Sequence, residues 1–192
     1  MAASFYALIA RMRHIKRWGL MRNSFEENIQ GHSHMTAVLA HALAVIRRDV
    51  IGADIDPYKV AVVALFHDAS EIITGDMPTP VKYKNPEIMS AYKQVERLAE
   101  EKLLRLLPEE MADAYKEVLS CTDHDIEQLV KAADKLSAYI KCVEERKAGN
   151  EEFKSAESQI KAILDNLKLP EVTYFMAHFM PAFGMTLDEL II

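Results

Sequence analysis

The spacing of apolar residues most constrains the fold of this chain, because it repeats at steps of three and four residues. Near the N-terminus the repeat is formed by Phe5, Leu8, Ile9, Met12 and Ile15. Such spacing gathers apolar side chains on one face of a helix, and the same pattern recurs through most of the chain. No strand-like alternation of useful length interrupts it. The sequence therefore predicts an all-α fold.

Helix boundaries are expected where capping residues, prolines and glycines fall. The expected helices cover about 5–18, 32–48, 56–73, 86–107, 109–120, 123–148, 150–168 and 171–180. Asp56 followed by Pro57 is a typical helix start, because Asp caps the free N–H groups and proline suits the first turn. Gly75 should end that helix, and the segment Gly75–Pro80 should form a rigid loop because its prolines lack N–H donors.

Length and charge limit the possible classes of protein. At 192 residues the chain is expected to form a single domain over residues 1–192, and 50% hydrophobic residues suffice for a continuous core. The formal net charge of −6 argues against binding a nucleic-acid polymer through its backbone. A small anionic ligand fits this balance better.

Cysteine usage indicates a reducing compartment, and hydropathy gives no sign of a membrane-spanning helix. Cys121 and Cys142 are the two cysteines, and their spacing matches neither a disulfide framework nor a thiolate zinc site. The longest apolar run, Val60–Phe66, is far shorter than the roughly 20 residues that a membrane-spanning helix needs. No secretory signal is recognised, so the cytoplasm is the expected location and no membrane partner is expected.

An imidazole and two carboxylates follow an apolar helical segment. His67 and Glu71 are four residues apart, and Asp68 and Glu71 are three apart, so a continuous helix would direct all three toward one neighbourhood. Such a group can bind a cation beside a proton acceptor. The alternative is coincidence, because a His-Asp pair by itself is common.

Two further residues favour the metal site. His32 begins a predicted helix, and Asp134 lies near the inward face of a long amphipathic helix. Burying an unpaired carboxylate is costly, so Asp134 implies a cation or another charged partner. The other histidines lack partners at useful spacing and are assigned no role.

The order His…His-Asp…Asp resembles the signature of the HD superfamily of metal-dependent phosphohydrolases. Further similarity to its bacterial 5'-deoxynucleotidase branch is carried by Arg17-Trp18, Glu27-Asn28, His67–Glu71, Thr74–Lys82 and Asp134. The resemblance covers nearly the whole chain. It implies a helical bundle of the HD-domain type, an enzyme that hydrolyses deoxyribonucleoside 5'-monophosphates to deoxynucleoside and phosphate, and a homodimer.

The resemblance implies that His32, His67, Asp68 and Asp134 ligate one divalent metal ion per chain. Imidazole and carboxylate ligands together suit transition ions better than calcium. The family favours Co²⁺ or Mn²⁺, with Zn²⁺ or Mg²⁺ as alternatives.

The resemblance also assigns catalytic and substrate-binding residues. Glu71 matches the carboxylate that handles the proton in hydrolysis, with an exposed helix-end charge as the alternative. Arg17 would hold the phosphate, because a guanidinium can donate two parallel hydrogen bonds to it.

Trp18 would pack on the sugar and help to reject a ribose 2'-hydroxyl, and Asp76 would bind the sugar hydroxyl side. Thr79 and Lys82 are further candidates for substrate binding. For the single tryptophan the alternative is core packing, and for Lys82 it is a solvated surface charge.

One position departs from the family pattern. Relatives usually carry an acidic residue before the first ligand histidine, whereas this chain has Gly31. Because outer-shell carboxylates orient ligands and tune the metal, affinity or metal preference is expected to differ. Glu26 and Glu27 are the candidates to compensate.

Two other functions remain as alternatives. One is an HD phosphohydrolase for another nucleotide phosphoester, such as a nucleoside triphosphate, although no Lys/Arg cluster for three phosphates is found. The other is a non-catalytic module that binds metal or nucleotide, although the expected ligands and Glu71 are all present.

Overall fold

The computed structural model describes residues 3–82 and 85–190, without the side chains of Thr79 and Pro80. Within these residues all regular elements are helical, which confirms the predicted all-α class. They are α1 (Phe5–Ile9), η1 (Ala10–His14), α2 (Ile29–Val45), η2 (Ile46–Ile51), α3 (Pro57–Phe66), α4 (Glu71–Thr74), α5 (Thr79–Lys82), α6 (Pro86–Leu104), α7 (Glu109–Leu119), α8 (His124–Lys147), η3 (Glu151–Phe153), α9 (Lys154–Leu167), α10 (Pro170–His178) and η4 (Met180–Gly184).

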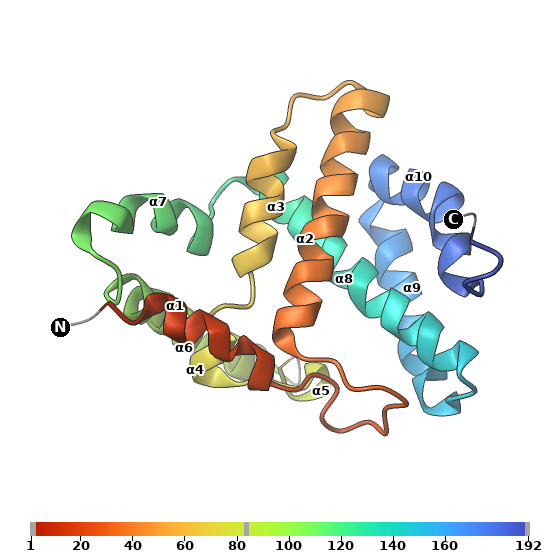
Figure 1. Ribbon diagram of the computed structural model, residues 1–192, viewed down its shortest axis with the longest axis horizontal. Helices are drawn as coiled ribbons and strands as arrows, with labels where there is room; N and C mark the ends of the chain where they lie inside the picture. The colour runs from red at the N-terminus through yellow and green to blue at the C-terminus, as the bar shows by residue number, and fades with distance from the viewer. Residues whose placement is uncertain (1–2, 83–84, 191–192) are drawn as a thin grey trace.

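Helices α2, α3 and α8 form the centre of the molecule. Figure 1 shows α2 and α3 side by side with α8 crossing them, while α9 and α10 lie on the C-terminal side and α1, α6 and α7 on the other. The apolar faces of the central helices meet α10 in the main core, which includes Leu43, Val60, Leu136 and Phe175. Fully burying one such leucine contributes roughly 1.5–3 kcal/mol.

A smaller core lies under the N-terminal helix. Phe5 is fully buried there and packs with Leu103, Leu107 and Leu119 of the α6 and α7 region. Ala69 belongs to the same cluster, so the turn after α3 packs against this smaller core. The two cores therefore flank the segment that carries the His-Asp pair.

Short polar residues start the central helices where their side chains satisfy free backbone donors. The Asn28 side chain accepts the Gly31 N–H at 2.9 Å before α2, and Asp56 accepts from Tyr58 at 2.9 Å before α3. Asp123 does the same for α8. Each such cap contributes about 1 kcal/mol.

The expected helix over 56–73 is interrupted. It ends at Phe66, a turn follows, and the short helix α4 begins at Glu71. The His67 N–H bonds to the Ala64 carbonyl, three residues back, so the regular four-residue ladder stops there. The prediction of one continuous helix through Ile73 is therefore wrong.

Two further boundaries differ from expectation. The first helical segment ends at His14, because the chain becomes extended and Lys16 pairs with Asn28 in an antiparallel bridge. The segment Gly75–Pro80 is not wholly a loop, because α5 begins at Thr79. Proline is compatible with the first turn of a helix, where an N–H has no partner to bond.

A search for membrane-spanning segments covered the residues that the structure describes. None of their helices combines the length and apolar character required to cross a bilayer.

Candidate active site

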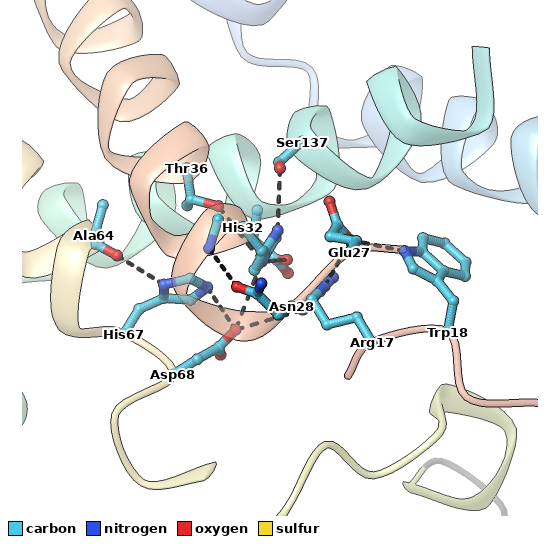
Figure 2. A network of polar contacts seen from close by, with 12 residues as sticks. Arg17, Trp18, Glu27, Asn28, His32, Thr36, Ala64, His67, Asp68 and Ser137 are labelled. Atoms are coloured by element: carbon cyan, nitrogen blue, oxygen red, sulfur yellow. Dashed lines mark hydrogen bonds and ion pairs between the residues drawn. The ribbon is translucent and has the colours of Figure 1, made fainter. Parts of the chain in front are cut away.

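Four of the predicted residues converge from three separate elements. His32 lies in the first turn of α2, His67 and Asp68 lie in the turn after α3, and Asp134 lies on α8. His32 Nε2 is 3.2 Å from Asp134 Oδ1 and 3.5 Å from Asp68 Oδ2, and His67 Nε2 is 3.2 Å from the same Asp68 oxygen. Figure 2 shows the two imidazoles and Asp68 directed toward one point.

The orientation of His67 fits a metal ligand. Its Nδ1 lies 2.7 Å from the Ala64 carbonyl oxygen, which can only accept, so Nδ1 carries the proton. Its Nε2 is buried and faces Asp68 Oδ2 at 3.2 Å, without a hydrogen bond of regular geometry among the described residues. In the neutral ring that nitrogen presents a lone pair to a carboxylate, an arrangement that requires a cation or proton between them.

Three of these residues could hold a cation together. His32, His67 and Asp68 each offer one donor atom, and these atoms lie within 4.8 Å of one another. The Oδ1 atom of Asp134 lies beside the His32 donor. The donor set, imidazole with carboxylate, suits Zn²⁺, Co²⁺ or Mn²⁺.

The His32 ring is fully buried and is oriented from α8. Its Nδ1 is 3.0 Å from Ser137 Oγ, and its Nε2 is 3.4 Å from Thr36 Oγ1. Ser137 follows Asp134 by three residues on α8, so the two side chains share a face of that helix. One helix thus supplies both a carboxylate and a support for the imidazole.

Electrostatics in the cluster favour ionised carboxylates. Burial by itself raises the pKa of Asp68, but the neighbouring imidazoles of His67 and His32 outweigh it and lower the pKa to about 2. Burial opposes ionisation of Asp134 too, yet hydrogen bonding to His32 and the charge of Lys135 bring its pKa well below the usual value. The two carboxylates therefore remain negative at neutral pH and attract a cation.

Arg17 lies at the edge of the cluster. Its Nη1 is 3.5 Å from Asp68 Oδ2, and its Nε donates to Glu27 Oε2 at 3.0 Å. Burial alone would lower the pKa of Arg17, but Asp68, Asp134, Glu27 and Asp76 together raise it. A guanidinium that stays charged beside the cluster is suited to hold a phosphate.

Trp18 is adjacent to Arg17 and is bound by the same acid. Its Nε1 donates to Glu27 Oε2 at 2.8 Å, and its ring packs on Phe153 with centroids 5.3 Å apart. The side chain is half-buried rather than part of the main core. Trp18 therefore packs on a buried aromatic ring but belongs to neither of the two apolar cores described above.

Glu71 and Asp76 are two more acids whose charges interact with the cluster residue Asp68. Burial, with the charges of Asp68 and Asp76, raises the pKa of Glu71 to about 9, and one of its oxygens is buried without a hydrogen-bond partner among the described residues. Burial likewise raises the pKa of Asp76, against the attraction of Arg17. These carboxyl groups hold protons more tightly than exposed acids do.

The remaining predicted contacts lie further out or cannot be placed. Lys82 Nζ is 2.8 Å from Glu96 Oε1 and 4.6 Å from the centre of the Tyr92 ring, so it is engaged by α6 rather than simply solvated. The side chain of Thr79 lies outside the described residues.

Comparison with known proteins places this site in a family. Residues 4–183 match the family described as YfbR-like, 5'-deoxynucleotidase YfbR-like. A 5'-deoxynucleotidase from Vibrio parahaemolyticus is 46% identical over 188 residues, covering 97% of each chain. One from Photorhabdus laumondii is 44% identical, covering 97% of this chain and 95% of that one.

This chain belongs to the YfbR-like 5'-deoxynucleotidase family. The family predicted from the sequence is thereby confirmed.

Solved structures show that this family member has the HD-domain fold. An HD-domain phosphohydrolase from Listeria innocua matches with a TM-score of 0.80 and 21% identity, covering 94% of this chain and 88% of that one. An HD phosphohydrolase of cyanophage S-2L, described as bound to dA and one catalytic Zn²⁺ ion, matches with a TM-score of 0.65 and 22% identity, covering 94% and 96%.

Gly31 stands where relatives usually carry an acidic residue, and its surroundings are open in this family member. A Cβ at Gly31 would lie 3.7 Å from the Asn28 side-chain oxygen, an ordinary van der Waals contact. Of the two candidates to compensate, Glu26 is exposed and pairs with Lys16, whereas Glu27 lies at the site.

Two neighbours of the site, Ser137 and Thr36, are not predicted from the sequence. Glu27 is predicted only through the family resemblance and as a candidate to compensate for Gly31, not as a partner of Arg17 and Trp18. Ser137 could have been found from its three-residue spacing to Asp134, and Thr36 from its four-residue spacing to His32. No local signal identifies Glu27, because its contacts depend on how the segment before α2 turns back.

Proposed function

We propose that this chain is a metal-dependent 5'-deoxynucleotidase that hydrolyses deoxyribonucleoside 5'-monophosphates to deoxynucleoside and phosphate. The observation that carries the proposal is the meeting of His32, His67, Asp68 and Asp134 with the Arg17 guanidinium beside them. Family membership supports the same substrate class, because the curated relatives are named for that activity.

In this proposal the four cluster residues hold one divalent ion. Co²⁺ or Mn²⁺ is favoured, with Zn²⁺ or Mg²⁺ as alternatives, and the buried Nε2 of His67, which faces Asp68 Oδ2 at 3.2 Å, supports the assignment. When bound, such an ion polarises a phosphoryl oxygen and makes a water molecule more acidic.

The chain's own residues would bind the substrate and handle the proton. Arg17 donates hydrogen bonds to the phosphate and compensates its charge as water attacks phosphorus and the bond to the 5'-oxygen breaks. Glu71 holds or releases the transferred proton, because burial and the neighbouring acids raise its pKa to about 9 and so let it carry a proton near neutral pH.

The sugar would lie between Trp18 and Asp76, with Thr79 and Lys82 as further substrate contacts. Support comes from Trp18, whose half-buried ring is held against Phe153 next to Arg17. Asp76 lies close enough to Arg17 for the two charges to affect each other's pKa.

The proposal also includes one domain over residues 1–192, a cytoplasmic location, no polymeric nucleic-acid partner and a homodimer. The net charge of −6 supports the absence of such a partner. Exposed apolar side chains along one face of α3, from Tyr58, Val62 and Leu65, support an interface between copies.

A panel of nucleotides tests the function. The purified protein, supplied with Co²⁺ or Mn²⁺, is expected to release phosphate from deoxyribonucleoside monophosphates much faster than from ribonucleoside monophosphates or triphosphates. Chelation should abolish release. The Glu71→Ala variant should lose turnover, by roughly 100-fold or more, while still binding the metal in a calorimetric titration.

The result that would reject the proposal is absence of phosphate release from every deoxyribonucleoside monophosphate. Faster release of phosphate from a triphosphate would favour an HD phosphohydrolase that acts on another nucleotide phosphoester. Metal binding without turnover of any nucleotide would favour the non-catalytic module.

A further inference from the structure

The segment that carries Arg17 and Trp18 is built around a single carboxylate oxygen. Glu27 Oε2 accepts from Arg17 Nε at 3.0 Å and from Trp18 Nε1 at 2.8 Å, as Figure 2 shows. The Glu27 side chain is 16% exposed and that of Arg17 is 13% exposed, so solvent competes little with these bonds. Hydrogen bonds to a charged acceptor in such surroundings are among the stronger ones in proteins.

The bond to Nε determines what Arg17 can offer to a ligand. A guanidinium has donors on Nε and on both terminal nitrogens, and Glu27 takes up the inner one. The terminal Nη1 is then directed to the cluster, 3.5 Å from Asp68 Oδ2. Without Glu27, the same arginine would be free to turn its inner donor toward the acids of the cluster.

Trp18 needs such a support because its backbone is strained. Its φ is +58°, in the left-handed region that bulky residues rarely adopt. A conformation of this kind is unfavourable for a bulky side chain and persists only where the surroundings hold it. The indole bond to Glu27, the Phe153 ring and a hydrogen bond from Asn23 to the Trp18 carbonyl provide that restraint.

Glu27 is also fixed with respect to the metal-ligand residues. Its carbonyl oxygen accepts the Arg17 N–H at 3.0 Å, and the next residue, Asn28, caps helix α2. His32 lies in the first turn of that helix. A short, hydrogen-bonded segment therefore links the carboxylate of Glu27 to the position of the cluster.

We propose that Glu27 is a positioning residue that holds Arg17 and Trp18 as one unit beside the cluster. Glu27 thereby links the phosphate contact of Arg17 to the discrimination between deoxyribose and ribose by Trp18. The second part rests on the function proposed above, because it requires that phosphate meets Arg17 and that the sugar meets Trp18.

The experiment compares Glu27→Ala and Glu27→Gln with Glu26→Ala. Glu26 is a matched control, because it is the adjacent acid, is 73% exposed and pairs with the surface residue Lys16. Trp18 is the only tryptophan, so its fluorescence reports directly on this segment. Acrylamide quenching of the unliganded protein is measured first, followed by kcat and KM with dAMP and AMP in the presence of Co²⁺.

In Glu27→Ala, quenching should rise at least twofold, and kcat/KM for dAMP should fall about 10- to 100-fold, because misplaced binding groups cost rates of that order. The ratio of kcat/KM for dAMP to that for AMP should fall as well. Glu27→Gln keeps an acceptor oxygen for the indole, so its quenching should stay nearer to the wild type. Glu26→Ala should match the wild type in all readouts.

Unchanged quenching in both Glu27 variants would overturn the positioning role. Equal losses for dAMP and AMP, with the ratio preserved, would overturn the link to sugar selection. If the wild type hydrolysed no deoxynucleotide, the proposed function and the sugar link would both fall. Quenching would still decide whether Glu27 positions Trp18. Should Glu27→Ala not fold, Glu27→Gln is judged by kcat/KM for dAMP instead. This value should fall because a neutral amide binds the charged Arg17 Nε less well than the carboxylate does, and an unchanged value would overturn the positioning role.

Discussion

At the scale of single residues, the imidazole of His32 depends on a hydroxyl that is not itself a predicted ligand. Ser137 Oγ lies 3.0 Å from its Nδ1 and leaves Nε2 directed to the two aspartates. Groups that orient a ligating imidazole fix both its tautomer and its angle to the ion. Metal affinity should therefore be sensitive to this position even though the hydroxyl lies behind the ring.

Ser137→Ala is expected to weaken Co²⁺ or Mn²⁺ binding by about 10- to 100-fold, the range typical for such supporting contacts. Isothermal titration with the metal alone measures it. Ser33→Ala is a matched control, because Ser33 is buried next to His32 but its hydroxyl has no hydrogen-bond partner among the described residues. Equal affinities for the two variants would show that the Ser137 contact does not orient the ligand.

At the scale of elements, the break between α3 and α4 shapes the site. Because α3 ends at Phe66, His67 and Asp68 lie in a turn that meets α2 and α8, while Glu71 begins the next helix. Gly75 then ends α4 with φ +72° and ψ 164°, a conformation essentially restricted to glycine. That conformation sets the direction in which Asp76 leaves the helix.

Gly75→Ala should destabilise the protein by roughly 1–3 kcal/mol. A Cβ at this position meets no atom within 4 Å, so the cost arises from the backbone alone. Because Asp76 would be displaced, kcat/KM for dAMP should also fall about 10-fold or more. Urea unfolding and steady-state kinetics measure the two effects.

Gly52→Ala provides the comparison for this element. Gly52 also has a positive φ, +85°, and open space around it, but it ends η2 and lies outside the cluster of site residues. It should lose stability of about 1 kcal/mol without a change in kcat/KM. A similar loss of activity in both variants would contradict the role assigned to the α4 end.

At the scale of the whole molecule, a buried ion pair attaches the segment before α2 to α8. The side chains of Lys141 and Glu145 are 2% and 0% exposed and pair with each other. Lys141 also donates to the Phe25 carbonyl at 2.6 Å, and Glu145 accepts the Ser24 N–H at 2.9 Å. Removing one partner of such a pair typically costs 3–5 kcal/mol, because the other charge stays buried.

The pH dependence of stability follows from Glu145. Burial by itself raises its pKa, but hydrogen bonds from Lys141, Asn150 and Ser24 outweigh burial and lower the pKa from 4.5 to about 2. The folded state therefore favours the ionised carboxylate. Its stabilising contribution is complete above pH 4.5 and is lost as the pH falls toward 2.

Glu145→Gln should therefore lower the free energy of unfolding by about 3 kcal/mol at pH 7. The difference from the wild type should shrink as the pH falls from 4.5 toward 2. Urea unfolding at a series of pH values measures it, with Glu144→Gln as the control because that side chain is exposed on the same helix. A gap that stayed constant across this range would exclude the ionised Glu145 as its source.

The local sequence was sufficient for the all-α class and most helix boundaries. Those features depend on residues close together in the chain: apolar spacing for α2 and α8, and caps such as Asp56 for α3. The interruption after Phe66 was missed because a backbone break leaves no mark in apolar spacing. Side-chain order along the chain was also sufficient to recognise the family, and the comparisons confirm that membership.

Tertiary structure alone decided which atoms meet. The sequence named His32, His67, Asp68 and Asp134, but only the crossing of α2 and α8 beside the α3 turn brings their donor atoms to within hydrogen-bonding distances. The joint attachment of Arg17 and Trp18 to Glu27 likewise depends on a chain reversal. Contacts between distant residues depend on how whole elements pack, and local patterns carry no record of that packing.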